Sequence, residues 1–297
     1  MSVSRVSVLD RDPPIAAAAA APPSRAGLPL YFAGAFGITW LCWGLAALIG
    51  RELIALPVPT DLLMLLGGLG PLVAAIGVAA QRSGGAGVRA LLGRLLGWRV
   101  GPVWYAVALL AWPAVDLVLI LLNLAAGGAL PPAPPASVWL AVPGLFLRTV
   151  LLGGGLYEEV GWRGFALPRL QERYGALAAS LLLGLVWAAW HLPLWFVPGQ
   201  EMPPFLLFVP NVVALSVVLA WLYNGTQGSL LIVALAHTAN NVAFRVFGQA
   251  VAAMPEDGLR VGPLLTDVAV PVGMVVLVAL LTDPRTLTRR PRRAPAS

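Results

Sequence analysis

Long apolar runs recur along the chain and constrain its fold more than any other feature. Eight runs of roughly 20 residues are visible, and a helix of that length crosses the hydrocarbon core of a bilayer. The pattern predicts an all-α fold, a polytopic transmembrane helical bundle of about eight spans. The predicted spans are residues 29–50, 61–81, 102–127, 137–157, 175–196, 204–223, 230–247 and 262–282.

The composition excludes an ordinary soluble protein. Of the 297 residues, 59% are hydrophobic and 11% are charged, whereas about a quarter of the residues in a soluble protein are charged. The net charge of +6 is spread over loops and tails and does not form the clustered basic face of a nucleic-acid-binding domain. We therefore expect membrane lipid as a partner and no nucleic acid.

Arginines are concentrated in alternate loops, which predicts the orientation of the bundle. Both tails and the loops near residues 82–99 and 169–173 are arginine-rich, and the loops between them are poorer. This distribution predicts that both termini are cytoplasmic. The predicted organisation is a disordered N-terminal tail over residues 1–27, a transmembrane domain over 28–283 and a basic C-terminal tail over 284–297.

Two further features concern the membrane. Residues 83–101 have the leucine and arginine spacing of a short amphipathic helix lying on the inner membrane face. The chain is rich in alanine, glycine and proline and has arginine but no lysine, which is typical of a GC-rich genome. We therefore expect an integral protein of a bacterial cell membrane.

Ionisable residues inside the apolar runs are few and clustered. A charge at the centre of a membrane helix costs roughly 2.5–3.5 kcal/mol on insertion scales, so such residues tend to be functional. The segment after the fourth run contains Glu158, Glu159 and Arg163. Glu159 and Arg163 are four residues apart and share a helix face, while Glu158 points about 100° away. One carboxylate thus has a counter-ion and its neighbour is free.

Both histidines of the chain also lie in apolar runs. His191 follows Trp187 by one helical turn, and His237 precedes Asn241 by one turn on the same face. A single histidine in such a place is more often a packing residue. Two histidines accompanied by a carboxylate pair and an asparagine indicate a site.

The spacing predicts that two of these groups meet. The turn of a hairpin is expected at Tyr174-Gly175, with Glu158 and His191 each 16 residues from it. Equidistant residues of two antiparallel helices lie at one height, here roughly 24 Å from the turn. Glu158 and His191 are therefore expected at the same depth, and the helix should continue past Glu158.

The three motifs together resemble those of the CAAX-protease and bacteriocin-processing (CPBP) family. They are the Glu-Glu-x-x-x-Arg segment at 158–163, the Trp-x-x-x-His segment at 187–191 and the His-x-x-x-Asn segment at 237–241. The second motif often begins with phenylalanine in the family, and here it begins with Trp187. The resemblance covers about residues 145–245. It implies an intramembrane glutamic endopeptidase, related to the type II CAAX prenyl endopeptidase, that cleaves a peptide or protein substrate without a metal or other cofactor.

The resemblance also implies a role for each motif residue. Glu158, aided by His191, would activate a water molecule as general base. His237 and Asn241 would donate hydrogen bonds to the tetrahedral oxyanion. Glu159 and Arg163 would support the geometry of the helix. Three tryptophans beside the motifs are expected to wall an apolar substrate groove: Trp162, Trp187 and Trp190.

Alternatives remain open at this point. Two histidines and a glutamate are a familiar zinc ligand set, although the chain contains no His-Glu-x-x-His segment. The same buried groups would suit a proton-coupled transporter, but no repeat of two halves is evident. A non-catalytic immunity or scaffold protein is the third alternative. Outside the cluster, Asp116 is expected to pair with Arg148, and Arg245 to line the cavity or extend to the interface.

Overall fold

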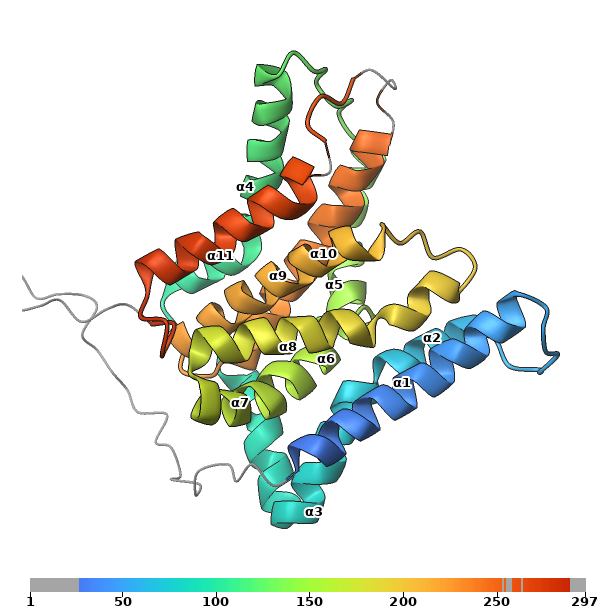
Figure 1. Cartoon of the computed structure of the whole chain (residues 1–297), viewed down its shortest axis with the longest axis vertical. Helices are drawn as coiled ribbons and strands as arrows, with labels where there is room; N and C mark the ends of the chain where they lie inside the picture. The colour runs from blue at the N-terminus through green and yellow to red at the C-terminus, as the bar shows by residue number, and fades with distance from the viewer. Residues whose placement is uncertain (1–26, 253, 255–257, 263, 289–297) are drawn as a thin grey trace, which may run out of the picture.

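The computed structural model describes residues 27–288 except 253, 255–257 and 263. The regular secondary structure of the described residues is helical, and short loops join the helices (Figure 1). The predicted N-terminal tail, apart from Gly27, and residues 289–297 of the predicted basic tail lie outside the described residues. The helices are α1 (Leu28–Gly50), α2 (Thr60–Gly68), α3 (Gly70–Gly93), η1 (Arg94–Leu96), α4 (Pro102–Ala125), α5 (Ala136–Leu152), α6 (Tyr157–Glu159), η2 (Val160–Ala166), α7 (Leu167–Tyr174), α8 (Ala176–Trp190), η3 (Leu192–Phe196), α9 (Phe205–Gly225), α10 (Leu230–Ala252), η4 (Leu264–Ala269) and α11 (Val270–Leu281).

The prediction of an all-α membrane bundle is confirmed. Within the described residues, six helices are long and apolar enough to cross a membrane, and the pair formed by α2 and α3, bent by 44°, makes a seventh if it counts as one span. The helix at Leu265–Leu281 is apolar but shorter. The count of eight spans and the cytoplasmic termini stay predictions.

The bundle has a central group of helices with others packed on two sides (Figure 1). Helices α8, α9 and α10 form the centre, and η2 and α7 pack against them. On one side lie α1, α2 and α3; α3 contacts η2, and α1 contacts η3. On the other side, α4 packs on α10, and α11 packs on α9. The site residues predicted from the sequence lie in α6, η2, α8 and α10, or, for His191, directly after α8.

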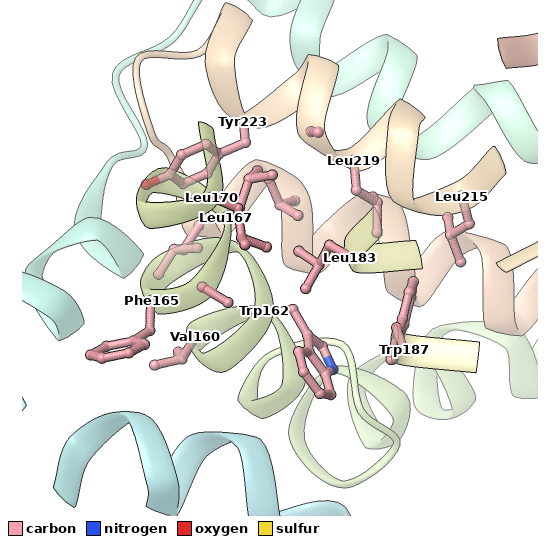
Figure 2. Close-up of a cluster of buried hydrophobic side chains, with 14 of the residues drawn as sticks. Val160, Trp162, Phe165, Leu167, Leu170, Leu183, Trp187, Leu215, Leu219 and Tyr223 are labelled. Atoms are coloured by element: carbon pink, nitrogen blue, oxygen red, sulfur yellow. The ribbon is translucent and has the colours of Figure 1, made fainter. Parts of the chain in front are cut away.

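The interior of this central group is filled by large apolar side chains. Figure 2 shows part of it, with Val160 and Phe165 of η2, Leu183 of α8, and Leu215 and Leu219 of α9. All five are buried. Since lipid is as apolar as these side chains, close packing contributes more to holding such helices together than exclusion of water does.

Helix α1 is tied to the end of α8 by hydrogen bonds. The Trp190 indole nitrogen donates to Thr39 Oγ1 at 2.8 Å, and the Thr39 hydroxyl donates to the Gly67 carbonyl at 2.6 Å. The Trp40 indole nitrogen donates to the carbonyl of Trp190 at 3.1 Å. Buried polar bonds of this kind fix the residue that follows Trp190, which is His191.

The predicted hairpin turn is present. Helix α7 ends at Tyr174 and α8 begins at Ala176, with Gly175 between them at φ 73°. This conformation favours glycine. The first residues of the predicted basic tail pack beneath this turn, because the amide of Ala176 donates to the carbonyl of Arg285 at 2.8 Å and Leu287 is fully buried.

Of the segment 83–101, expected to be an amphipathic surface helix, residues 83–93 belong to α3, 94–96 form η1 and the rest is loop. Gly84 interrupts α3 with non-helical angles (φ 58°), and the helix ends at Gly93. Leu91 is buried while Leu96 is 77% exposed, so the apolar side chains are divided between the protein interior and its surface. Its position on the inner membrane face stays a prediction.

Candidate active site

The fourth helical segment runs on past Glu158, as predicted, because Ala136–Tyr174 is one candidate span. It is interrupted before the two glutamates, which the prediction of a continuous helix did not include. Helix α5 ends at Leu152, and α6 begins at Tyr157. Between them the chain passes through glycines, and Gly154 has φ 102°, which a side chain would strain. After this break, Glu158 and Glu159 lie in the first turn of the helical stretch that continues into η2.

Glu159 is the centre of a buried ionic cluster. Its Oε1 accepts a hydrogen bond from Arg163 Nη1 at 2.9 Å and one from His237 Nδ1 at 2.7 Å. Glu159 and Arg163 are both 0% exposed, and His237 is 3% exposed. The predicted pairing of Glu159 with Arg163 is therefore present. Because a carboxylate only accepts hydrogen bonds, His237 Nδ1 is the donor and Nε2 is left for other partners.

Arg163 lies in a π-helical turn. The turn η2 spans Val160–Ala166, and the amide of Leu167 donates to the carbonyl of Trp162, five residues earlier. Such turns widen the helix locally and are common at functional sites. The Arg163 guanidinium lies over the ring of Trp187 at 4.4 Å from the ring centroid, a favourable cation–π geometry.

Glu158 has a different environment from its neighbour. It is 7% exposed, and its Oε2 accepts a hydrogen bond from the Trp187 indole nitrogen at 2.9 Å. No cation pairs with it among the described residues. Glu158 is thus a buried carboxylate held by a neutral donor, which leaves its second oxygen for another group.

His191 is attached to the same tryptophan through the main chain. Its Nδ1 lies 2.8 Å from the carbonyl oxygen of Trp187, and a carbonyl only accepts, so Nδ1 carries the proton. The ring also packs edge-on against Trp190 at a centroid distance of 4.7 Å and against Phe208 at 5.3 Å. In the neutral form, His191 Nε2 then carries a lone pair.

Trp187 therefore connects the motif residues. Its ring nitrogen holds Glu158, its carbonyl holds His191, and its ring lies edge-on to His237 at a centroid distance of 5.2 Å. The hairpin prediction placed Glu158 opposite His191. In the structure Glu158 bonds to Trp187, one turn earlier in α8, and His191 bonds to the same residue.

Asn241 lies at the end of the cluster, one turn beyond His237 in α10. Its Nδ2 donates to the carbonyl of Gly153 at 3.3 Å, and its Oδ1 accepts from Asn240 Nδ2 at 3.1 Å. The first of these bonds joins α10 to the glycine break after α5. Both distances are at the long end for hydrogen bonds, so the Asn241 amide is held loosely.

Three tryptophans expected to wall a substrate groove are interior residues. Trp162 and Trp190 are 0% exposed and Trp187 is 1% exposed. The rings of Trp162 and Trp190 pack against each other at a centroid distance of 5.7 Å and against Tyr31 and Trp43 of α1, and the Trp187 ring packs against His237. The structure gives no support for an open groove along them, because each ring face is covered by other side chains.

Two polar residues beside the cluster were missed by the sequence reasoning. The hydroxyls of Tyr31 and Thr238 are buried and, within the described residues, have no hydrogen-bond partner. A Cβ at Gly161, in η2, would lie 2.7 Å from the Tyr31 hydroxyl, so Tyr31 approaches the backbone between Glu159 and Arg163. Thr238 could have been noticed in the sequence, because it directly follows the motif residue His237. Tyr31 is more than 120 residues away from the motif and gave no signal.

Two other expectations concern ions. In the described part of the chain, no three histidine, cysteine or carboxylate side chains are arranged to hold a metal ion; metal independence itself stays a prediction. Asp116 does not form an ion pair with Arg148, and that expectation is wrong. The one arginine–carboxylate pair found among the described residues is Arg163–Glu159.

Fold and site together define a class, the integral membrane proteins with a buried glutamate–histidine centre between their helices. A family model described as "Type II CAAX prenyl endopeptidase Rce1-like" matches residues 138–243, which include every motif residue discussed above. A similar protein is the "CAAX prenyl protease 2" of Methanococcus maripaludis, 27% identical over 226 residues, which are 72% of this chain and 82% of that protein. Both matches support the resemblance to the CAAX-protease family that the motifs indicated, and with it a membrane-embedded protease.

Proposed function

We propose that this protease hydrolyses peptide bonds of membrane-embedded, lipid-modified or apolar substrates with a water molecule activated by Glu158 and His191. The observation that carries the proposal is the difference between the two neighbouring glutamates. Glu159 is paired through its Oε1 with the Arg163 guanidinium and bonded to His237, while Glu158 has no cationic partner among the described residues and bonds only to the neutral Trp187 indole. A general base needs an available lone pair next to the reacting water.

The proposed first step forms a tetrahedral intermediate. The water oxygen bonds to the carbonyl carbon of the scissile peptide, and its proton passes to the carboxylate of Glu158. His191 Nε2 accepts a hydrogen bond from the same water and orients it, because its Nδ1 is already directed to the Trp187 carbonyl. In the second step the carbon–nitrogen bond breaks, and the proton held by Glu158 moves to the departing amine, which restores the enzyme.

The negative charge on the carbonyl oxygen is assigned to His237 and Asn241. When it is protonated on both nitrogens, His237 directs Nε2–H away from Glu159, whose carboxylate stabilises the imidazolium. The Asn241 amide is loosely held by the Gly153 carbonyl at 3.3 Å and can exchange that acceptor for the oxyanion. Preorganised donors of this kind are typically worth about 10²–10³ in rate each.

The substrate class follows from the membrane setting and the relative. The printed name of the Methanococcus maripaludis protein refers to CAAX and prenyl groups, so lipid-modified peptides are the first substrates to test. We also propose, from the composition, a bacterial cell membrane as the location. A proton-coupled transporter or a non-catalytic immunity or scaffold protein is less favoured, because the family and the relative are proteases.

The test is hydrolysis by the full-length protein in liposomes. The probe is a fluorescent peptide with an S-prenylated cysteine followed by three apolar residues, and products are identified by mass spectrometry. Wild type should cleave it, and Glu158→Gln and His191→Ala should not. Glu201→Gln, which changes an exposed loop acid, is the matched control and should retain activity. Cleavage that persists in the Glu158→Gln protein would sink the proposal.

A further inference from the structure

Two arginines gather beside one buried tyrosine at the end of the π-helical turn. Arg94 of η1 donates through Nη1 to the carbonyl of Gly164 at 3.3 Å and to the hydroxyl of Tyr223. Arg169 of α7 donates through Nη1 to the carbonyl of Phe165 at 2.7 Å, and its guanidinium lies over the Phe165 ring at 3.7 Å from the centroid. Two consecutive carbonyls of η2 therefore hold the two guanidiniums close to each other.

This pair of cations has no acidic partner within the described residues. Neither arginine forms an ion pair there, and the two are near enough to repel each other. Glu172, three residues after Arg169, attracts Arg169, but its own side chain is exposed to solvent. The Arg169 Nε–H is buried and has no hydrogen-bond partner in the described part of the chain. An anion bound between the two guanidiniums would relieve their repulsion and accept the remaining N–H groups.

Tyr223 of α9 adds a hydroxyl to the two guanidiniums. The residue is 6% exposed, and Figure 2 shows its hydroxyl at the rim of the buried apolar cluster. Since the Tyr223 oxygen accepts a hydrogen bond from Arg94, its own O–H stays a donor. Two guanidiniums and a hydroxyl form a set of donors, and such a set fits the oxygens of a phosphate, which guanidiniums bind through parallel hydrogen bonds.

The surroundings of the two arginines favour the phosphate of a lipid. Leu96 and Trp98, two and four residues after Arg94, are 77% and 58% exposed. On the other side, Arg169 lies near the end of the apolar segment Ala136–Tyr174, where a membrane span would leave the bilayer. Exposed tryptophan beside arginine at the end of a span is typical of the headgroup region. A phospholipid bound there also contacts the exposed apolar side chains, which offer nothing to a free phosphate ion.

We propose that Arg94, Arg169 and Tyr223 bind the phosphate of an anionic phospholipid. Both arginines are bonded to carbonyls of η2, the turn that contains Arg163 of the buried ionic cluster. The bound lipid therefore stabilises this turn from the membrane surface, and the stability of the site depends on the lipid that surrounds the protein. This inference concerns lipid alone and holds whichever residue activates the water in the proposed hydrolysis.

The experiment measures lipid binding to the full-length protein by native mass spectrometry. The probes are phosphatidylglycerol and phosphatidylcholine with the same acyl chains. Wild type should bind phosphatidylglycerol roughly 10-fold or more tightly, the range of one hydrogen bond to a charged group. Arg94→Gln/Arg169→Gln should lose this preference, and Tyr223→Phe should keep part of it. The matched control is Arg173→Gln, which removes an exposed arginine of the same helix α7 and should keep the full preference.

The outcomes distinguish this site from a general effect of charge. Equal binding of the two lipids by wild type would overturn the proposal, and so would an equal loss of preference in Arg173→Gln and the double variant. Arg94→Gln alone changes an exposed side chain, so it supplies a folded variant whatever the double change does, and it should lose most of the preference. Sodium phosphate should displace the lipid no better than sodium chloride of equal ionic strength; specific displacement by phosphate would assign the site to the free ion and contradict the lipid.

Discussion

Glu158 and Glu159 are adjacent in sequence and both buried, yet their hydrogen-bond partners differ. Glu159 is bonded to a guanidinium and an imidazole, which together satisfy one of its oxygens. Glu158 is bonded to a neutral indole. An ion pair buried in a bilayer organises its neighbours and resists change, whereas a carboxylate without a cation can take and return a proton. From this difference we propose that Glu159 holds the site together and that Glu158 carries the chemistry.

The largest effect should follow from changing the available carboxylate. Glu158→Gln keeps the shape and still accepts the Trp187 N–H but removes the base. We expect kcat to fall by roughly 10²–10⁴, the usual contribution of a general base, with a melting temperature close to that of wild type. Peptide hydrolysis and thermal unfolding in detergent check this. A large loss of stability would show that Glu158 is as structural as its neighbour.

Glu159→Gln, in contrast to Glu158→Gln, should lower the stability of the protein as well as its activity. It leaves the Arg163 guanidinium buried without its counter-ion, and breaking such a pair typically costs about 3–5 kcal/mol. We expect a clear fall in melting temperature together with loss of activity. The double variant Glu159→Gln/Arg163→Met, which removes both charges, should regain stability but not activity. A single variant as stable as wild type would contradict the structural role of the pair.

Asn241→Ala tests the proposed oxyanion side of the site. The variant loses a donor that matters mainly in the transition state, so we expect kcat to fall by about 10²–10³ with little change in KM. Asn240→Ala is the neighbouring control and should have a small effect, since Asn240 bonds only to the oxygen of Asn241. Steady-state kinetics on the reporter peptide distinguish the two.

Trp187→Phe should give the smallest effect of the four. It keeps the ring that lies against His237 and under Arg163, and it removes the N–H that bonds to Glu158 at 2.9 Å. Hydrogen bonds to charged groups are worth about 1.5–3 kcal/mol, so we expect a fall in kcat of roughly 10- to 100-fold with KM preserved. Unchanged kinetics would mean that the indole serves packing alone.

Much of the fold could be predicted because the membrane imposes a simple rule. Apolar runs of sufficient length become helices, and the turn at Gly175 followed from a hairpin between two such runs. The Glu159–Arg163 pair followed from helical periodicity. The number of spans was less certain, because the bend between α2 and α3 and the short helix at Leu265–Leu281 depend on local geometry.

The remaining parts of the site depend on contacts that helical periodicity does not encode. The bond between His237 and Glu159 joins residues 78 apart in the chain. The connecting role of Trp187 requires its ring, its nitrogen and its carbonyl to face three different neighbours. The glycine break at Gly154 was hidden inside an apolar run, because glycine is tolerated within membrane helices as well as at their ends.

The most direct test of the account is a single-turnover hydrolysis in water enriched in oxygen-18, with mass spectrometry of the peptide product and of the enzyme. If water activated by Glu158 attacks the peptide carbonyl, one heavy oxygen should appear in the new carboxyl group of the wild-type product, and the Glu158→Gln protein should form essentially no product. Heavy oxygen in the Glu158 side chain instead of the product would indicate covalent attack by the carboxylate and would contradict the account.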